Sequence, residues 1–272
     1  MTHLDTTKPN VARIYDYWLG GKDNFAADRA AAEAVREQRP DITDLVLENK
    51  QFLTRAVTHV AGQGVRQFLD VGSGLPTLPV RAKGAAPLWQ PTHLAAQAVA
   101  PDALVCYVDN DPVAVAHSRA LLAHGSSHVV VAQGDMLDPQ AVLDHEALRT
   151  AGFSLRAPVC VMLGCVLHFL DYGTAQRVAS GFTGALPPGS YAIISVGRGD
   201  EEVGEEFAST YNAQHGSQVF NFTRAEVAAL FGGVEVEAPG IVPAPMWRPD
   251  GPEASAVPDR RAMILAGVGR RP

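Results

Sequence analysis

Five short apolar segments, separated by stretches rich in helix formers, constrain this chain more than any other feature. They are RQFLDV (66–71), LVCYVD (104–109), HVVVAQ (128–133), PVCVML (158–163) and YAIISV (191–196). Each is apolar at consecutive positions, which is typical of strands covered on both faces, as in a parallel sheet. VEVEA (234–238) and AMILAGV (262–268) are two further strand candidates. The pattern predicts an α/β fold with a doubly wound, mostly parallel, seven-stranded sheet of Rossmann-like type.

Several segments between these strands begin with residues that favour the start of a helix. Asp111 and Asp138 each stand as an N-cap directly before a proline, which is well tolerated at the first helical position. Thr223 and Glu226 have the spacing of a capping box. These signals support helices that alternate with the strands.

The chain before the sheet predicts helices, and two later regions predict loops. Residues 26–38 are rich in helix formers, and a second helix is expected from an N-cap at Asp41 to about residue 59. We therefore divide the chain into an N-terminal helical segment, 1–60, and a sheet domain, 61–272. Residues 78–91 and 239–261 are expected to be loops.

Composition narrows the functional classes. A net charge of −7 argues against a nucleic-acid partner, and no apolar run reaches the roughly 18 residues that a membrane span needs. The N-terminus lacks a basic-then-apolar signal pattern, so we expect a cytoplasmic protein. Cys106, Cys160 and Cys165 lie in apolar runs and predict buried, reduced thiols and no metal site. The oligomeric state, monomer or homodimer, stays open.

Two glycines follow the first strand in QFLDVGSGLP (67–76). Gly72 and Gly74 lack side chains at the point where a ligand approaches the backbone in open α/β sheets, although a tight turn alone would also need them. A dinucleotide site is a weaker reading, because Thr77 replaces the third glycine and Pro76 disturbs the helix start. A P-loop is excluded because no Gly-Lys-Ser/Thr follows.

Acidic residues follow the next two strands. Asp109 ends the second strand, where a carboxylate can accept hydrogen bonds from both hydroxyls of a ribose. Asp135, after the third strand, is placed to accept from an adenine amino group, and Met136 to pack on the ring. Their alternative role is in turns and caps, as expected for Asp111. Together with the glycines they predict a nucleoside site without phosphates.

At these residues the chain resembles a class I S-adenosylmethionine-dependent methyltransferase. More closely, it resembles an actinobacterial family of S-adenosyl methyltransferases that long carried a label of unknown function. The resemblance rests on PNVARIYDYWLGGKDNFAADR (9–29), QFLDVGSGLPT (67–77), YVDNDPVAVAHSRALL (107–122), VLHFL (166–170), FTRAEVAALF (222–231) and EAPGIVPAPMWRPD (237–250). It implies S-adenosylmethionine as cofactor and a small-molecule acceptor. The cofactor contacts that it implies are Asp70, Gly72, Ser73, Gly74, Asp109, Asn110, Asp135, Met136 and Leu163.

Two departures from the family stand near the glycine loop. About a dozen additional residues, centred on 79–90, precede PTHLAAQAVAP, and Leu94 stands where the family tends to carry an acid. Both leave open a different reaction on the same cofactor.

The segment RIYDYWLGGKDNF (13–25) is dense in groups that can cover a charged ligand. Arg13 is a candidate for the methionyl carboxylate, and the ring of Tyr15 or Tyr17 for the sulfonium. With a turn at Gly20 and Gly21, residues 11–25 are predicted to form a lid over the site. The alternative is an amphipathic helix whose aromatic residues pack on the sheet edge.

Methyl transfer requires alignment more than a fixed catalytic motif. His168, after the fourth strand, is the candidate base, with Asp171 and Tyr172 as neighbours that could replace it; a structural histidine is the alternative. No N/D-P-P-Y/F pattern is present, which favours a small, secondary metabolite as acceptor. Three other functions remain: attack on the methionyl chain of the cofactor with release of methylthioadenosine, non-catalytic cofactor binding, and, more distantly, an NAD-dependent oxidoreductase.

Overall fold

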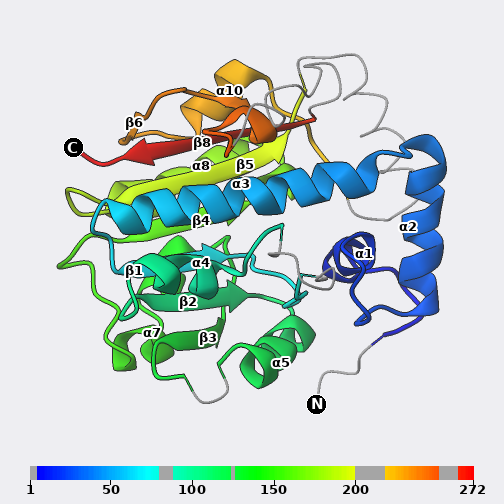
Figure 1. Ribbon diagram of the computed structural model, residues 1–272, viewed down its shortest axis with the longest axis horizontal. Coiled ribbons are helices and arrows are strands. Elements are labelled where there is room, and N and C mark those ends of the chain that lie inside the picture. Colours follow the sequence, from blue (N-terminus) through cyan, green and yellow to red (C-terminus); the bar gives the residue numbers. More distant parts are fainter. Residues whose placement is uncertain (1–4, 80–87, 124–125, 200–217, 251–262) are drawn as a thin grey trace.

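The computed structural model describes residues 5–79, 88–123, 126–199, 218–250 and 263–272. Within them the chain forms a single twisted sheet in the order β3-β2-β1-β4-β5-β8-β6, with β7 paired to β8 (Figure 1). The strands are β1 (Gln67–Val71), β2 (Leu104–Asp109), β3 (Val129–Gln133), β4 (Cys160–Gly164), β5 (Tyr191–Gly197), β6 (Glu235–Val236), β7 (Val242–Pro243) and β8 (Ile264–Arg270). The strand order reverses between β1 and β4, which is where ligands bind in such sheets.

The strand pairing confirms a mostly parallel, doubly wound α/β fold. Strands β1 to β5, which are neighbours in the sheet, pair in parallel, whereas β8 runs antiparallel to β5, β6 and β7. The seven predicted strands are all present, although β6 has only two residues. Strand β7 was not predicted, because it lies inside the expected loop 239–261; its two residues are too few to carry a periodic signal.

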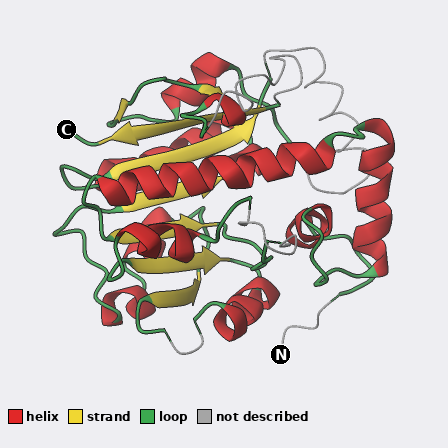
Figure 2. Cartoon of the chain, in the orientation of Figure 1, coloured by secondary structure: helices red, strands yellow, loops and turns green. Residues whose placement is uncertain are grey.

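Alternate residues of the central strands enter two separate cores, which explains their uninterrupted apolar sequences. In β1, Leu69 belongs to one core and Phe68 to the other; in β2, Cys106 and Val105 divide in the same way. Helices therefore cover both faces, as the cartoon shows (Figure 2). The cysteines Cys106 and Cys160 are buried in these cores, as expected.

The helices that cover the sheet are α4 (Thr92–Val99), α5 (Pro112–Leu121), α6 (Pro139–Leu143), α7 (Glu146–Thr150), α8 (Tyr172–Ala185) and α10 (Arg224–Ala229), with the short 3₁₀ turns η1 (Leu167–Phe169) and η2 (Ala244–Met246). Among them, α5, α6 and α10 begin at the three predicted positions. Asp111 and Asp138 each accept a backbone N–H of the helix that follows, and Thr223 with Glu226 forms the predicted capping box.

Three helices precede the sheet: α1 (Val11–Trp18), α2 (Ala26–Gln38) and α3 (Ile42–Gly62). Asp41 precedes α3 as predicted, but its side chain makes no cap bond and instead forms an ion pair with Arg39. The C-terminal half of α3 packs on the sheet through Phe52, Val57 and neighbouring residues, while its first turns pack with α1 and α2 in a third core. Helix α3 thus links the two segments that the sequence divides at residue 60.

Most of the additional segment around 79–90 lies outside the described residues. Leu94 lies on α4 with 43% of its surface exposed. Among the helices of the described ranges, none has the length and apolar content to cross a membrane.

Candidate functional site

A cavity of about 610 Å³ lies at the carboxyl ends of the parallel strands, which is an ordinary size for a small-molecule site. Segments far apart in the sequence line it: α1, the first half of α3, and the loops that follow β1, β2, β3 and β4. Figure 1 shows α1 beyond the tip of β2, and α3 crosses the sheet from the side on which α1 and α2 lie. The predicted residues that line the cavity are Tyr15, Gly72, Ser73, Gly74, Asp109, Asn110, Met136 and His168.

The glycine loop after β1 has a backbone that glycine favours. Gly72 has φ of 68° and Gly74 has φ of 67°, both in the left-handed region. A Cβ at Gly72 would lie 2.5 Å from Cγ1 of Val166, whereas one at Gly74 would approach only Cβ of Ala12, at 3.8 Å. The backbone N–H groups of Gly72 and Ser73 donate to the carbonyl of Val108 in β2. The loop is therefore held in place from the neighbouring strand.

Asp109 lies at the end of β2, beside this loop. Its Oδ2 accepts from the N–H of Gly74 at 2.7 Å, and its Oδ1 accepts from the N–H of Asp111 at 2.9 Å. Burial raises the pKa of Asp109, and these backbone hydrogen bonds counteract that effect. A carboxylate has about four acceptor positions, so these hydrogen bonds leave capacity for a ligand.

The loops after β2 and β3 form the adjoining wall. Asn110 and Met136 line the cavity, as predicted. Asp135 stands outside the described lining and is exposed; its Oδ1 accepts from the N–H of Leu137 at 2.9 Å. One carboxylate oxygen of Asp135 thus serves a turn, as its alternative role anticipated.

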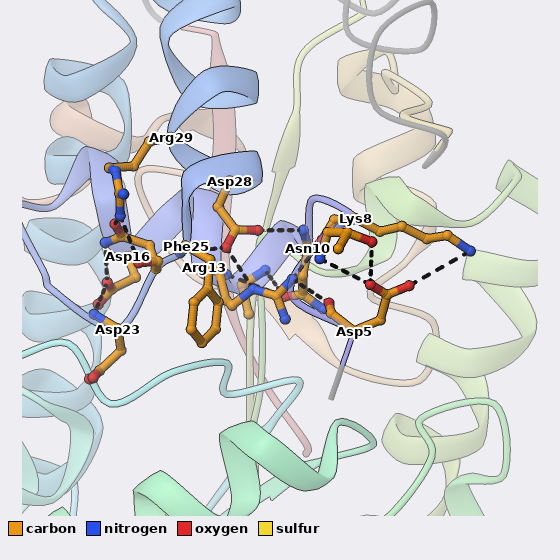
Figure 3. Close-up of polar contacts among 12 residues, drawn as sticks. Asp5, Lys8, Asn10, Arg13, Asp16, Asp23, Phe25, Asp28 and Arg29 are labelled. Carbon is orange, nitrogen blue, oxygen red and sulfur yellow. Dashed lines mark hydrogen bonds and ion pairs between the residues drawn. The ribbon is translucent and has the colours of Figure 1, made fainter. Parts of the chain in front are cut away.

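Arg13 does not line the cavity, so the prediction that it binds the methionyl carboxylate of the cofactor is not supported. It is 4% exposed, and its Nε donates to Oδ2 of the buried Asp28 at 2.7 Å (Figure 3). Its Nη2 donates to the carbonyl oxygens of Lys8 and Asp5. Asp28 also accepts from the N–H groups of Asn10 and Phe25. Arg13 therefore joins α1 to α2 and to the chain before α1.

Other polar residues of α1 attach it to the sheet. The carboxylate of Asp16 is 1% exposed; its Oδ1 accepts from the hydroxyl of Thr77 at 2.6 Å, and its Oδ2 from the N–H of Asp23. Figure 3 shows Asp16 beside Asp23, at the opposite end of α1 from Asn10. Asn10 caps α1 and donates from Nδ2 to Oδ2 of Asp111 at 3.3 Å. These contacts hold α1 over the glycine loop and the end of β2.

The two tyrosines of α1 have separate roles. Tyr15 lines the cavity, and its hydroxyl donates to the carbonyl of Val46 and accepts from the side chain of Asn49. Tyr17 lies outside the described lining of the cavity, and its hydroxyl donates to Glu33 on α2. Of the two candidates for the sulfonium, only Tyr15 faces the cavity.

Sequence reasoning did not identify a polar network that starts from α3. Asn49 is 1% exposed, and its Oδ1 accepts from the hydroxyl of Ser195 at 2.8 Å. That hydroxyl also accepts from the N–H of Cys165, a cavity residue with a φ of 56°. Asn49 interrupts the apolar stripe of α3, and this interruption was the available signal. Lys50 beside it also lines the cavity and was also missed.

His168 faces the cavity, but as a neutral hydrogen-bond donor. Its Nδ1 accepts from the N–H of Gly197 at 3.2 Å, so the neutral ring carries its proton on Nε2. Burial lowers the pKa of His168 to about 4. The ring therefore stays neutral near pH 7, and its acceptor nitrogen is already used. This geometry does not support the predicted role as general base.

The remaining predicted residues lie outside the described lining of the cavity. Leu163 is buried in the sheet core, so the structure does not support its predicted contact with the cofactor. Asp70 accepts from the hydroxyl of Thr92 at 2.7 Å, with its pKa raised by burial. Asp171 caps α8 by accepting from the N–H of Thr174, and Tyr172 packs edge-on against Phe222.

The side of the cavity away from the strand-end loops is mainly apolar. It lies between the first turns of α3, the end of α1, η1, and the chain just before β8. Its apolar lining residues are Trp18, Leu19, Ile42, Leu45, Val46, Phe169, Val219, Met263 and Ile264, and the polar residues Arg39, Gln218 and Asn221 from neighbouring positions line the cavity as well. In the described residues, no group of acidic, histidine and cysteine side chains has the arrangement of a metal site.

Comparison with known proteins agrees with this architecture. The sequence profile of the S-adenosyl methyltransferase family matches residues 1–272. A crystal structure of a methyltransferase candidate from Thermobifida fusca YX superposes with a TM-score of 0.88 at 36% identity, covering 98% of this chain and 96% of that one. A DUF574 family protein from Streptomyces avermitilis MA-4680 gives 0.87 at 35%, covering 99% and 100%.

More distant structures share the fold alone. The magnesium protoporphyrin IX methyltransferase from Synechocystis PCC 6803, solved with bound S-adenosylhomocysteine, has a TM-score of 0.52 at 13% identity and covers 95% of this chain and 98% of that one. Among curated proteins, none matches the sequence.

Proposed function

Since the chain belongs to the S-adenosyl methyltransferase family, with S-adenosylmethionine as the expected cofactor, we propose that it methylates a small, largely apolar molecule. One observation carries the proposal: a single cavity joins a glycine loop and a carboxylate on one side to an apolar wall on the other. The first side suits a nucleoside, and the second suits an uncharged acceptor beside it.

The residues at the strand ends fit the cofactor. Gly74 leaves room for a ligand close to the backbone, with Ser73 beside it, whereas Val166 fills the space beside Gly72. Asp109 keeps acceptor positions for the two ribose hydroxyls. Asn110 and Met136 flank the place proposed for the adenine, and Asp135 at its edge would accept from the amino group through its second oxygen.

Alignment and exclusion of water are what this chain contributes to the reaction. When bound, the cofactor supplies an electrophilic methyl group, and the protein holds the acceptor in line with it. The apolar wall formed by α1, α3 and η1 would orient the acceptor and exclude water. His168, with its proton on Nε2, would donate a hydrogen bond to an acceptor oxygen or nitrogen.

Helix α1 is the proposed lid. It is attached to the end of β2 and to the glycine loop through contacts of Asn10 and Asp16 that lie at the cavity. We expect residues 11–25 to open for ligand entry and to gain protection from hydrogen exchange when S-adenosylhomocysteine binds. Equal protection with and without ligand would mean that α1 is fixed packing, the alternative that its aromatic residues also allow.

Product analysis tests the reaction. The protein is incubated with methyl-labelled S-adenosylmethionine and fractions of small apolar metabolites, and the products are separated by chromatography. We expect label in the acceptor fraction and S-adenosylhomocysteine as co-product. Methylthioadenosine would instead indicate attack on the methionyl chain, and binding without turnover of any fraction would indicate a non-catalytic protein.

A further inference from the structure

Lys50 occupies an unusual position in the cavity. It lies on α3, one residue after Asn49, and lines the cavity together with the glycine loop. Its Nζ lies 5.5 Å from the ring centroid of Tyr15 and 5.6 Å from that of Trp89, which is 6% exposed. The ammonium group is thus held between two aromatic rings.

The ammonium group lacks a conventional partner. Within the described ranges, no hydrogen bond or ion pair joins Nζ of Lys50 to another residue. Burial lowers its pKa, and the nearby Asp70 and Cys165 counteract this only in part. Lys50 is only partly exposed, and a partly desolvated cation without hydrogen-bond acceptors is costly; two aromatic faces compensate only a fraction of that cost. The other lining cation, Arg39, already forms an ion pair with Asp41.

The surroundings of Lys50 indicate which part of a ligand would meet it. Its electrostatic neighbours, Asp70 and Cys165, stand at or just after the carboxyl ends of β1 and β4. Asp109 stands at the end of β2, on the other side of β1. A ligand whose ribose binds Asp109 and which passes the glycine loop would therefore bring its far end toward Lys50.

We propose that Lys50 binds the α-carboxylate of the amino-acid portion of the cofactor. This inference rests on the proposed function and takes over the role first expected of Arg13, whose guanidinium is bonded to Asp28. A carboxylate would satisfy the ammonium donors and neutralise its charge. The carboxylate of an acceptor has the same chemistry, and the experiment separates the two sources.

Calorimetric titration with two ligands tests the assignment. S-adenosylhomocysteine has the carboxylate, whereas 5′-methylthioadenosine has the same nucleoside and thioether without it. In Lys50→Met, we expect the affinity for S-adenosylhomocysteine to fall about 10- to 100-fold and that for methylthioadenosine to change less than about twofold. Lys8→Met, which removes a lysine whose side chain is 82% exposed and which precedes the proposed lid, is the control and should change neither.

Other outcomes are equally informative. An unchanged affinity of Lys50→Met for S-adenosylhomocysteine would overturn the proposal, and so would an equal loss for both ligands. A wild-type protein that binds neither ligand would overturn the proposed function as well. Methionine fills the space between the rings without a charge, so we expect this variant to fold and to melt at a higher temperature than wild type without ligand. Lys50→Gln provides a second uncharged variant for the same comparison.

Discussion

The two sides of the cavity use their charged and polar groups differently. On the sheet side, Asp109 engages two backbone N–H groups and retains acceptor positions toward the cavity. On the helix side, Arg13 and Asp28 form a buried ion pair, and Asp16 bonds Thr77. Both sides carry charges in segments that the family resemblance highlights, yet among these charges only that of Asp109 keeps positions for a ligand; the helix-side charge proposed for a ligand, Lys50, lies outside those segments.

This difference shows that a charged residue in a site-like segment can be committed to holding the site together. Helix α1 has only eight residues, too short to be stable alone, so its position depends on tertiary contacts. Arg13, Asn10 and Asp16 supply those contacts. The residues that hold α1 over the cavity are thus different from those proposed to hold the cofactor.

The largest expected effect concerns the buried ion pair. Arg13→Met leaves the fully buried carboxylate of Asp28 without its cation, and we expect the opening free energy of α1 to fall by about 3–5 kcal/mol. Hydrogen exchange of residues 11–18 measures it. Arg36→Met, which breaks an exposed pair with Glu33, should cost less than about 1 kcal/mol. Similar small losses in both variants would remove the contrast between the two sides.

The second prediction concerns the free acceptor positions of the sheet side. Asp109→Asn should weaken binding of S-adenosylhomocysteine by roughly 2–3 kcal/mol, because it replaces a charged acceptor with a neutral one. Calorimetry measures the change, and Asp102→Asn, which alters an exposed aspartate, is the control. Unchanged affinity would mean that Asp109 serves only the two backbone N–H groups that it binds here.

The third prediction uses the titration of His168. Its folded pKa of about 4 lies below the ordinary 6.5, so between these values the unfolded chain binds more protons than the folded one. Stability from this group is therefore complete above about pH 6.5 and is lost as the pH falls, by about 2 kcal/mol at pH 5.

Urea unfolding at pH 7 and pH 5 measures that loss. In His168→Asn, whose Oδ1 can still accept from the N–H of Gly197, the difference between the two pH values should shrink by about 2 kcal/mol. The exposed His128→Asn should keep the wild-type difference. If His168→Asn also keeps it, the ring is not the neutral, buried donor described here.

The smallest expected effect separates the two glycines. Gly72→Ala and Gly74→Ala share the same backbone strain, because their φ values differ by only 1° (68° and 67°). Only the alanine at position 72 would collide with Val166, so we expect it to cost about 1–2 kcal/mol more in urea unfolding. Equal costs would show that Val166 moves aside easily and that the loop is less tightly packed than the structure indicates.

Local and periodic signals were sufficient for most of the fold. The consecutive apolar runs predicted the central strands because each face of the sheet is covered by helices. Proline and N-cap pairs located the starts of α5 and α6. The two-residue strand β7 escaped prediction, since its pairing with β8 depends on contacts that no short window contains.

The candidate site was predictable only in part. Gly72, Gly74 and Asp109 stand at strand ends, so a prediction of the strands places them at one edge of the sheet. Arg13 and Lys50 could not be distinguished in the same way. Each is a cation on a helix, and its role depends on which groups the fold brings near it.

The sequence by itself therefore determined the sheet, its two covered faces and the glycine loop with its acid, because these follow from the spacing of residues along the chain. Only the tertiary structure decided which charges remain available in the cavity. Those charges depend on partners distant in sequence, such as Asp16 with Thr77 and Asn49 with Ser195. The free energy of a charged or polar group depends on its burial and on the groups that surround it, and both exist only once the chain has folded.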